Sequence, residues 1–126
     1  MLMVKTKIGP SGIAGIGLFA DQVILKGTVV WKYQEGFDLL LSKEEVEKLS
    51  GPAKEQFYNY AYLDKKRGKY MLCSDDARFF NHSDNYDCDD RVDDITTAVR
   101  DIEIGEELTV NYKDFYGDME RHPEVK

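Results

Sequence analysis

The sequence has few of the residues from which metal sites are commonly built. It contains two cysteines and two histidines in 126 residues, and the cysteines, Cys73 and Cys88, do not form a C-x-x-C pair. This count excludes a zinc site of three histidines, and the cysteine spacing argues against a site built on thiolates. We therefore expect no metal centre, although a site that mixes histidine with carboxylates stays open.

Long hydrophobic runs and an excess of basic residues are also lacking. No apolar run approaches the ~18 residues of a membrane span, and the first residues lack the apolar core of a signal peptide. We expect no membrane association, and reduced cysteines in the cytoplasm, or in the nucleus of a eukaryotic source. The net charge of -7 argues against direct nucleic-acid binding and suits a basic, lysine-containing protein segment. Charge that only keeps the protein in solution explains it equally well.

The chain nevertheless has the composition of a folded domain. Hydrophobic residues make up 42% of the chain and aromatic residues 12%, so residues 1–126 are expected to form one domain. A capping box at 42–45 and an apolar face over 53–61 predict two helices in the middle, with Gly51 ending the first. Alternating or β-branched segments predict strands at 4–8, 18–20, 28–33, 69–73, 95–100 and 107–112. This pattern predicts a mainly β fold with a small helical insert.

The glycine-rich segment 15–20 superficially matches the dinucleotide fingerprint G-x-G-x-x-[GA]. That fingerprint follows a buried strand and begins a helix, whereas here a loop precedes it and a strand-like segment follows. We therefore reject a dinucleotide site. Two interpretations stay open: the glycines permit a tight turn, or their bare backbone lets a ligand approach closely.

Two further polar segments attract attention as sites. Acidic clusters stand at 75–76 and 87–94, and the second lacks the glycine and the closing glutamate of a calcium loop, so we predict a solvated loop over 87–94 and not a metal site. His82 stands between Asn81 and Ser83. Because Ser-His-Asp triads are assembled from separated segments, we interpret His82, taken alone, as a structural hydrogen-bonding residue.

Three segments, in order, resemble the SET-domain family of protein-lysine methyltransferases. They are GIGLFADQVILKGTVVWKY, RFFNHS and AVRDIEIGEELTVNY, and together they span about Gly15 to Tyr112. The chain resembles a minimal, stand-alone SET domain without zinc-binding flanks, followed by a short tail over 113–126. The resemblance implies a β-clip-like fold of several small curved sheets. In that fold the RFFNHS segment and the C-terminal segment cross in a knot-like arrangement.

The resemblance also implies a reaction and the residues that carry it. The cofactor would be S-adenosyl-L-methionine, and the substrate a lysine side chain of a protein, reaching a narrow channel from the opposite face. Tyr112 matches the tyrosine at the site of transfer, although spacing alone would make it a core residue. The matching cofactor-binding positions are Gly15, Ile16, Gly17, Arg78, Asn81 and His82. The matching channel positions are Tyr33, Phe80, Phe115 and Tyr116.

The sequence departs from the family pattern in two places that leave alternatives open. Tyr86 and Asp87 stand where the family has Pro-Asn after the N-H-S motif, and the tail after Tyr112 is short. The tail is either mobile, or completed by a second subunit in a homodimer, or completed by the substrate. One rival function is a catalytically weak module that binds the cofactor or a basic peptide. Another is a metal-dependent hydrolase that uses His82 and the aspartate cluster.

Overall fold

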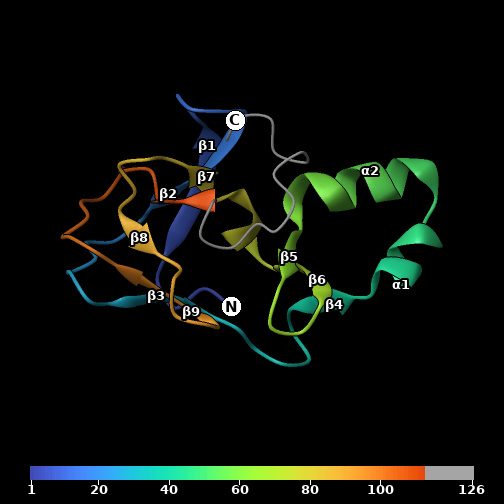
Figure 1. The fold of residues 1–126 in the computed structure, drawn as a ribbon. Helices are drawn as coiled ribbons and strands as arrows, with labels where there is room; N and C mark the ends of the chain where they lie inside the picture. Colours follow the sequence, from blue (N-terminus) through green and yellow to red (C-terminus); the bar gives the residue numbers. More distant parts are fainter. Residues whose placement is uncertain (113–126) are drawn as a thin grey trace.

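The computed structural model describes residues 1–112, and in this range the strands form four small sheets of two or three strands each. The elements are β1 (Thr6–Pro10), β2 (Ile16–Ala20), β3 (Val29–Lys32), β4 (Leu39–Leu41), α1 (Lys43–Glu47), α2 (Gly51–Tyr60), β5 (Tyr62–Asp64), β6 (Lys69–Leu72), the 3-10 helix η1 (Asp76–Phe79), β7 (Asn81–His82), β8 (Cys88–Asp89), β9 (Ile95–Ala98) and β10 (Thr109–Val110). Figure 1 shows α1 and α2 on one flank, with β3, β8 and β9 on the other. The predicted mainly β fold with a helical insert is confirmed.

The N-terminal hairpin carries the glycine-rich segment. β1 and β2 pair antiparallel, and Gly9 lies opposite Gly17. Gly15 in the connecting loop has φ +47°, in the left-handed region that favours glycine. β2 is a strand that leads into a turn and not into a helix, so the local structure is the one expected from the sequence. Leu18 and Ala20 are fully buried, so β2 turns one face into the main core.

The main core lies between this hairpin, the β3–β9–β8 sheet and the C-terminal segment. Isolated bridges join Phe19 to Glu107 and Ile24 to Ile102, so the last part of the described chain packs along the first. The buried residues of this core are Leu18, Ala20, Ile24, Val30, Cys88, Ala98, Ile102, Leu108, Val110 and Tyr112. Burial of such apolar surface is the main stabilising contribution in a domain of this size.

The helical insert forms a separate small core. The predicted capping box is present, because the Ser42 hydroxyl accepts from Glu45 N at 3.1 Å and the Glu45 carboxylate accepts from Ser42 N at 3.0 Å. Val46 and Phe57 are buried against Tyr70 of β6, which belongs to the β4–β6–β5 sheet. The prediction that Gly51 ends the first helix is wrong: α1 ends at Glu47 with Lys48 as its C-cap, and Gly51 is instead the first residue of α2, which Ser50 caps. No helix among residues 1–112 is both long and apolar enough to cross a membrane.

Strands β7 and β10 bring together two motifs that are distant in sequence. They pair in parallel, with Asn81 opposite Thr109 and His82 opposite Val110. Ser83 N also donates to Val110 O at 3.0 Å. Figure 1 shows this pair near the centre of the molecule, beside β2. The RFFNHS and TVNY segments are therefore neighbours, as the predicted crossing requires.

Candidate functional site

Tyr112 lies at the end of the described chain and is bound at two points to the RFFNHS motif. Its hydroxyl donates to the backbone oxygen of Phe80 at 2.6 Å, and its backbone N–H donates to His82 Nδ1 at 3.1 Å. Only 7% of the residue is exposed. With both the backbone and the hydroxyl held, the ring has little freedom to leave this position.

Two hollows with different linings adjoin Tyr112. The hollow that we name the glycine-loop hollow is lined by Ala14, Gly15, Ile16, Asn59, Tyr60, Arg78, Phe79, Phe80, Asn81 and Tyr112. The other, which we name the acidic-loop hollow, is lined by residues 63–66 and 90–96 together with Trp31, Tyr60, Tyr62, Cys73, Ala77, Arg78, Phe80, Val110 and Tyr112. Tyr60, Arg78, Phe80 and Tyr112 belong to both linings, so the two hollows meet at these four side chains.

Asn81 fixes the loop that lines the glycine-loop hollow. Its Nδ2 lies 3.1 Å from Ala14 O and 3.3 Å from Ile16 O, and 2.9 Å from a Glu107 carboxylate oxygen. A fourth acceptor, Ser11 Oγ, is 3.1 Å away. The amide has only two protons to share among these acceptors. Asn81 therefore stabilises the loop by hydrogen bonds to the backbone carbonyls on both sides of Gly15.

Glu107 completes this arrangement, and the sequence interpretation did not single it out. Its carboxylate accepts from Ser11 Oγ at 2.8 Å as well as from Asn81. A Cβ added to Gly17 would stand 2.6 Å from Glu107 Oε2. The lack of a side chain at Gly17 therefore makes room for this carboxylate. The signal was available, because Glu107 belongs to the quoted GEELTVNY motif, but nothing in one sequence shows that it faces a glycine of β2.

His82 stabilises the position of Tyr112 by accepting a hydrogen bond from its backbone N–H. Because its Nδ1 accepts from the Tyr112 backbone, Nε2 carries the proton in the neutral ring and can donate to Asp84 Oδ1, 3.1 Å away. The His82 and Tyr112 rings lie 5.5 Å apart between centroids. His82 is absent from the lining of both hollows. The structural hydrogen-bonding role predicted for His82 taken alone agrees with these contacts.

Aromatic side chains form much of the inner wall of the acidic-loop hollow. Tyr62 donates its hydroxyl to Met71 Sδ at 3.1 Å, and burial raises the pKa of this phenol well above its ordinary value. Trp31 is 5% exposed, and its indole N–H has no hydrogen-bond partner within residues 1–112. Neither residue was predicted to line a channel. The hollow thus combines apolar rings with a buried donor that is left without an acceptor.

The other predicted site residues fall into three groups. Gly15, Ile16, Arg78 and Asn81 line the glycine-loop hollow, and Phe80 lines both hollows. Gly17 and Tyr33 are in neither lining. Tyr33 packs against the cluster of Trp31, Met71, Cys73 and Ala77, and the Arg67 guanidinium lies over its ring. Phe115 and Tyr116 lie outside the described residues.

The prediction of a solvated loop over 87–94 is wrong at Asp87, and Asp75 of the other acidic cluster is also held by hydrogen bonds. Asp87 is 2% exposed and accepts from Thr109 N at 2.7 Å, so it ties the segment before β8 to β10. Burial raises the pKa of this carboxyl. Asp75 accepts from Leu2 N at 2.7 Å and from Ala77 N at 3.1 Å, which caps η1. Such hydrogen bonds offset the cost of removing a carboxylate from water, and the sequence pattern does not show their donors.

The remaining charges and thiols show no metal centre in the described part of the chain. Residues 1–112 contain no group of three or more His, Cys, Asp or Glu side chains placed to hold a metal ion. Cys73 and Cys88 are free and buried, and burial raises the pKa of both thiols.

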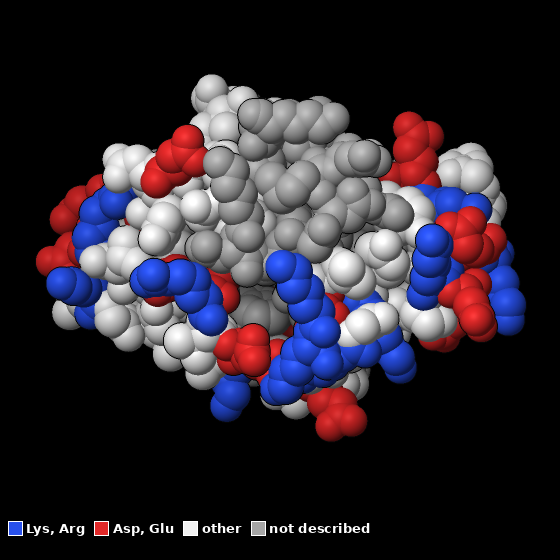
Figure 2. Space-filling view, in the orientation of Figure 1, with Lys and Arg blue, Asp and Glu red and all other residues white. Residues whose placement is uncertain are grey.

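Figure 2 shows the surface of the molecule in the orientation of Figure 1. Acidic and basic side chains are interspersed on both flanks of this face, so the net negative charge is not gathered there in one patch.

The protein is thus a small domain of several short sheets, in which a buried tyrosine belongs to the linings of two hollows. The SET-domain sequence profile matches residues 15–113, most of the chain. The protein belongs to the SET-domain family. Members of this family are S-adenosylmethionine-dependent protein-lysine methyltransferases. None of the curated proteins compared with this chain matches it.

Solved structures with the same fold include proteins of two eukaryotes. A Plasmodium falciparum protein, PFL0690c, described as a candidate histone methyltransferase, is 19% identical with a TM-score of 0.60, and the match covers 88% of this chain and 95% of that one. Chaetomium thermophilum PRC2 bound to S-adenosylmethionine is 21% identical with a TM-score of 0.66. A humanised mutant of the same complex, bound to the inhibitor GSK126, is 25% identical with a TM-score of 0.67. Both PRC2 matches cover 94% of this chain but only 16% of the PRC2 chain.

Proposed function

We propose that this protein transfers a methyl group from S-adenosylmethionine to the side-chain amine of a lysine in a protein substrate. The observation that carries the proposal is that the two hollows share Tyr60, Arg78, Phe80 and Tyr112. A transfer between two bound molecules needs their reacting atoms in contact, and such alignment contributes several kcal/mol to lowering a barrier. Two hollows that share four lining residues, among them the buried Tyr112, support that arrangement.

The glycine-loop hollow fits the cofactor. A Cβ built on Gly15 meets no atom within 4 Å, so the backbone at this point borders open space that a ligand can approach. Asn81 and the carbonyls of Ala14 and Ile16 supply polar groups, while Tyr60 and Phe79 supply rings that contact each other edge to face at 5.3 Å. When bound, S-adenosylmethionine supplies an electrophilic methyl group on a positively charged sulfur. Gly15, Ile16, Arg78 and Asn81 are the residues that would hold it.

The acidic-loop hollow fits the lysine. A lysine amine is a nucleophile only when neutral, and its ordinary pKa of ~10.4 leaves about one in a thousand neutral at pH 7. The rings of Trp31, Tyr62 and Phe80 favour the neutral amine over the ammonium, because an apolar wall disfavours the charged form. Asp90 and Asp93 of the lining attract a cationic side chain towards the opening, while Asp94 is paired with Arg67 and Lys66, and the basic side chains of the lining offset part of this attraction.

Tyr112 is the residue that we assign to the transfer step. Its hydroxyl proton is already donated to Phe80 O, so its oxygen acts towards the reacting groups as a hydrogen-bond acceptor. An acceptor at this place orients an amine N–H and fixes the direction of the nitrogen lone pair. No histidine base is needed, since His82 is occupied by the Tyr112 backbone and by Asp84.

The free, buried cysteines agree with a reducing location, for which we propose the cytoplasm or the nucleus.

The proposal is tested with labelled S-adenosylmethionine and a panel of lysine-containing proteins and peptides. We expect label on lysine side chains and binding of S-adenosylhomocysteine by calorimetry. Binding without label on any acceptor would favour the rival, a module that binds without catalysis. The absence of both would reject an S-adenosylmethionine site altogether.

A further inference from the structure

Arg67 joins the two loops that line the acidic-loop hollow, although it is not itself part of the lining. Its guanidinium donates to both carboxylate oxygens of Asp94, at 2.9 and 3.0 Å, and to Asp64 at 2.5 Å. Asp64 ends β5 and Asp94 immediately precedes β9, so the guanidinium bridges two separate segments. The paired bonds to one carboxylate use the planar fork of arginine, which lysine lacks.

These ion pairs are better shielded than most surface pairs. The side chains of Arg67, Asp64 and Asp94 are 25%, 11% and 30% exposed, and exposed pairs contribute little because water and salt screen them. Asp64 also accepts from the backbone N–H groups of Lys66 and Arg67, at 3.0 and 3.3 Å, and so shapes the turn that carries the arginine. Arg67 holds the pKa of Asp94 below its ordinary value.

Tyr33 contacts both Arg67 and Asp94. The Arg67 guanidinium lies over its ring, with Cζ 4.4 Å from the ring centroid, a cation–π geometry. The Tyr33 N–H donates to Asp94 O at 2.9 Å. Asp94 has φ +66°, which is uncommon for a residue other than glycine. The backbone turn at Asp94 is therefore held by Tyr33 on one side and by Arg67 on the other.

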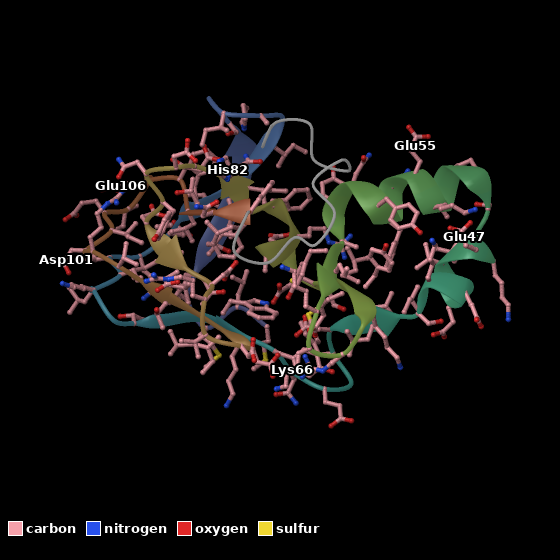
Figure 3. The ribbon with its side chains drawn as sticks, viewed as in Figure 1. Glu47, Glu55, Lys66, His82, Asp101 and Glu106 are labelled. Carbon is pink, nitrogen blue, oxygen red and sulfur yellow. The ribbon has the colours of Figure 1, made fainter. Side chains whose placement is uncertain are left out.

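Building on the function proposed above, we propose that Arg67 is a positioning residue for the protein substrate. With Asp64, Asp94 and Tyr33 it forms a clamp that holds residues 63–66 and 90–96 together and so fixes the shape of the acidic-loop hollow. None of these four residues lines the glycine-loop hollow. Figure 3 places Lys66, the neighbour of Arg67, at the β5–β6 turn on the lower edge, well apart in this view from His82 near β7. The clamp thus acts on the substrate side alone.

Three variants separate the clamp from general stability. Arg67→Ala removes the guanidinium bridge and leaves the more exposed Lys66–Asp94 pair, at 3.5 Å, between the two segments. Arg67→Lys keeps the charge without the fork. Asp94→Asn removes the partner charge with a residue that tolerates a left-handed backbone. Lys69→Ala is the matched control, because Lys69 is an exposed cation on the same hairpin and makes no ion pair with the clamp. Each protein is measured by hydrogen exchange, by calorimetry with S-adenosylhomocysteine, and by methylation of the best acceptor peptide of the panel.

In the three clamp variants we expect faster exchange at Tyr33 N–H and across 90–96, because these amides lose the contacts that hold them closed. We expect KM for the peptide to rise about tenfold, equivalent to one charge-assisted hydrogen bond. The Kd for S-adenosylhomocysteine should stay within about twofold, and Lys69→Ala should match the unmodified protein.

Unchanged exchange at these amides would overturn the clamp, as would Arg67→Lys behaving like the unmodified protein. Faster exchange with an unchanged KM would overturn its effect on the substrate. Should Arg67→Ala fail to fold, Asp94→Asn gives the same measurements. If the unmodified protein methylates no peptide, the proposed function fails, and the exchange measurement still decides whether the clamp exists.

Discussion

Replacing Gly17 by alanine tests whether Glu107 anchors the loop of the glycine-loop hollow. The added Cβ would lie 2.6 Å from Glu107 Oε2 and 2.9 Å from its Cδ, closer than real Cβ contacts allow. The carboxylate must therefore move, and it loses its hydrogen bonds from Ser11 and Asn81. Each hydrogen bond to a charged group contributes ~1.5–3 kcal/mol. Because Glu107 is half-buried and regains contact with water when it moves, we expect a loss of about 2–3 kcal/mol of unfolding free energy, less than the full sum.

Gly9→Ala is the matched control, because Gly9 lies directly opposite Gly17 in the same hairpin. A Cβ on Gly9 would lie 3.7 Å from the Phe19 ring, an ordinary contact. Neither glycine has a positive φ, so alanine brings no backbone strain at either position. In a strand, alanine in place of glycine is otherwise favourable by ~0.5–1 kcal/mol. The control should therefore be neutral or slightly stabilising.

Urea unfolding of both variants gives the two free energies, and calorimetry with S-adenosylhomocysteine reports on the loop. We expect Gly17→Ala to weaken S-adenosylhomocysteine binding and Gly9→Ala to leave it unchanged. In a Glu107→Ala background the collision with the carboxylate is gone and a tight 3.0 Å contact with Ser11 Cβ is left, so the larger part of the cost of Gly17→Ala should disappear. The reasoning is refuted if the two glycine variants are equally stable, or if the cost of Gly17→Ala is the same in both backgrounds.

Two further predictions concern the residues next to Tyr112 and β10. His82→Ala should lower the unfolding free energy by about 1 kcal/mol, because the Tyr112 N–H loses its acceptor. The shape of the pH–rate profile should not change, and a lost limb would show that the histidine is a base. Burial raises the pKa of Asp87, so the stability it contributes is full below its ordinary pKa of ~3.9 and is lost as pH rises through the raised value. Asp87→Asn keeps an acceptor for Thr109 N, so its stability relative to the unmodified protein should increase as the pH rises above about 4. A constant difference in urea unfolding would contradict this.

Much of the fold could be predicted because its longer elements carry local signals. The capping box of α1 and the β-branched run of β3 are patterns of adjacent residues, and both elements lie close to where they were predicted. Strands of two or three residues, such as β7 and β8, are too short to show alternation and were missed. The strand predicted at 107–112 is reduced to Thr109–Val110, which pairs with β7, while Glu107 forms an isolated bridge with Phe19 of β2.

The candidate site could be predicted only as far as the family motifs reach. Gly15, Asn81 and Tyr112 are motif residues and line a common hollow. The partners that hold them come from other segments. Glu107 contacts Asn81 across separate strands, and a single sequence carries no mark of that contact.

Tyr33 shows the converse limit. Its motif position predicts a channel wall, whereas its contacts with Arg67 and with the Asp94 carbonyl come from segments that no motif marks, and it lies in the lining of neither hollow.

The central claim is that methyl transfer takes place at Tyr112, where the two hollows meet. The most direct test compares the unmodified protein with Tyr112→Phe in a single turnover, using labelled S-adenosylmethionine and mass spectrometry of the acceptor lysine. We predict label on the lysine side chain with the unmodified protein and a rate lower by about 100-fold in Tyr112→Phe, while S-adenosylhomocysteine still binds. Transfer at an equal rate by Tyr112→Phe, or no transfer by the unmodified protein with the cofactor bound, would contradict the account.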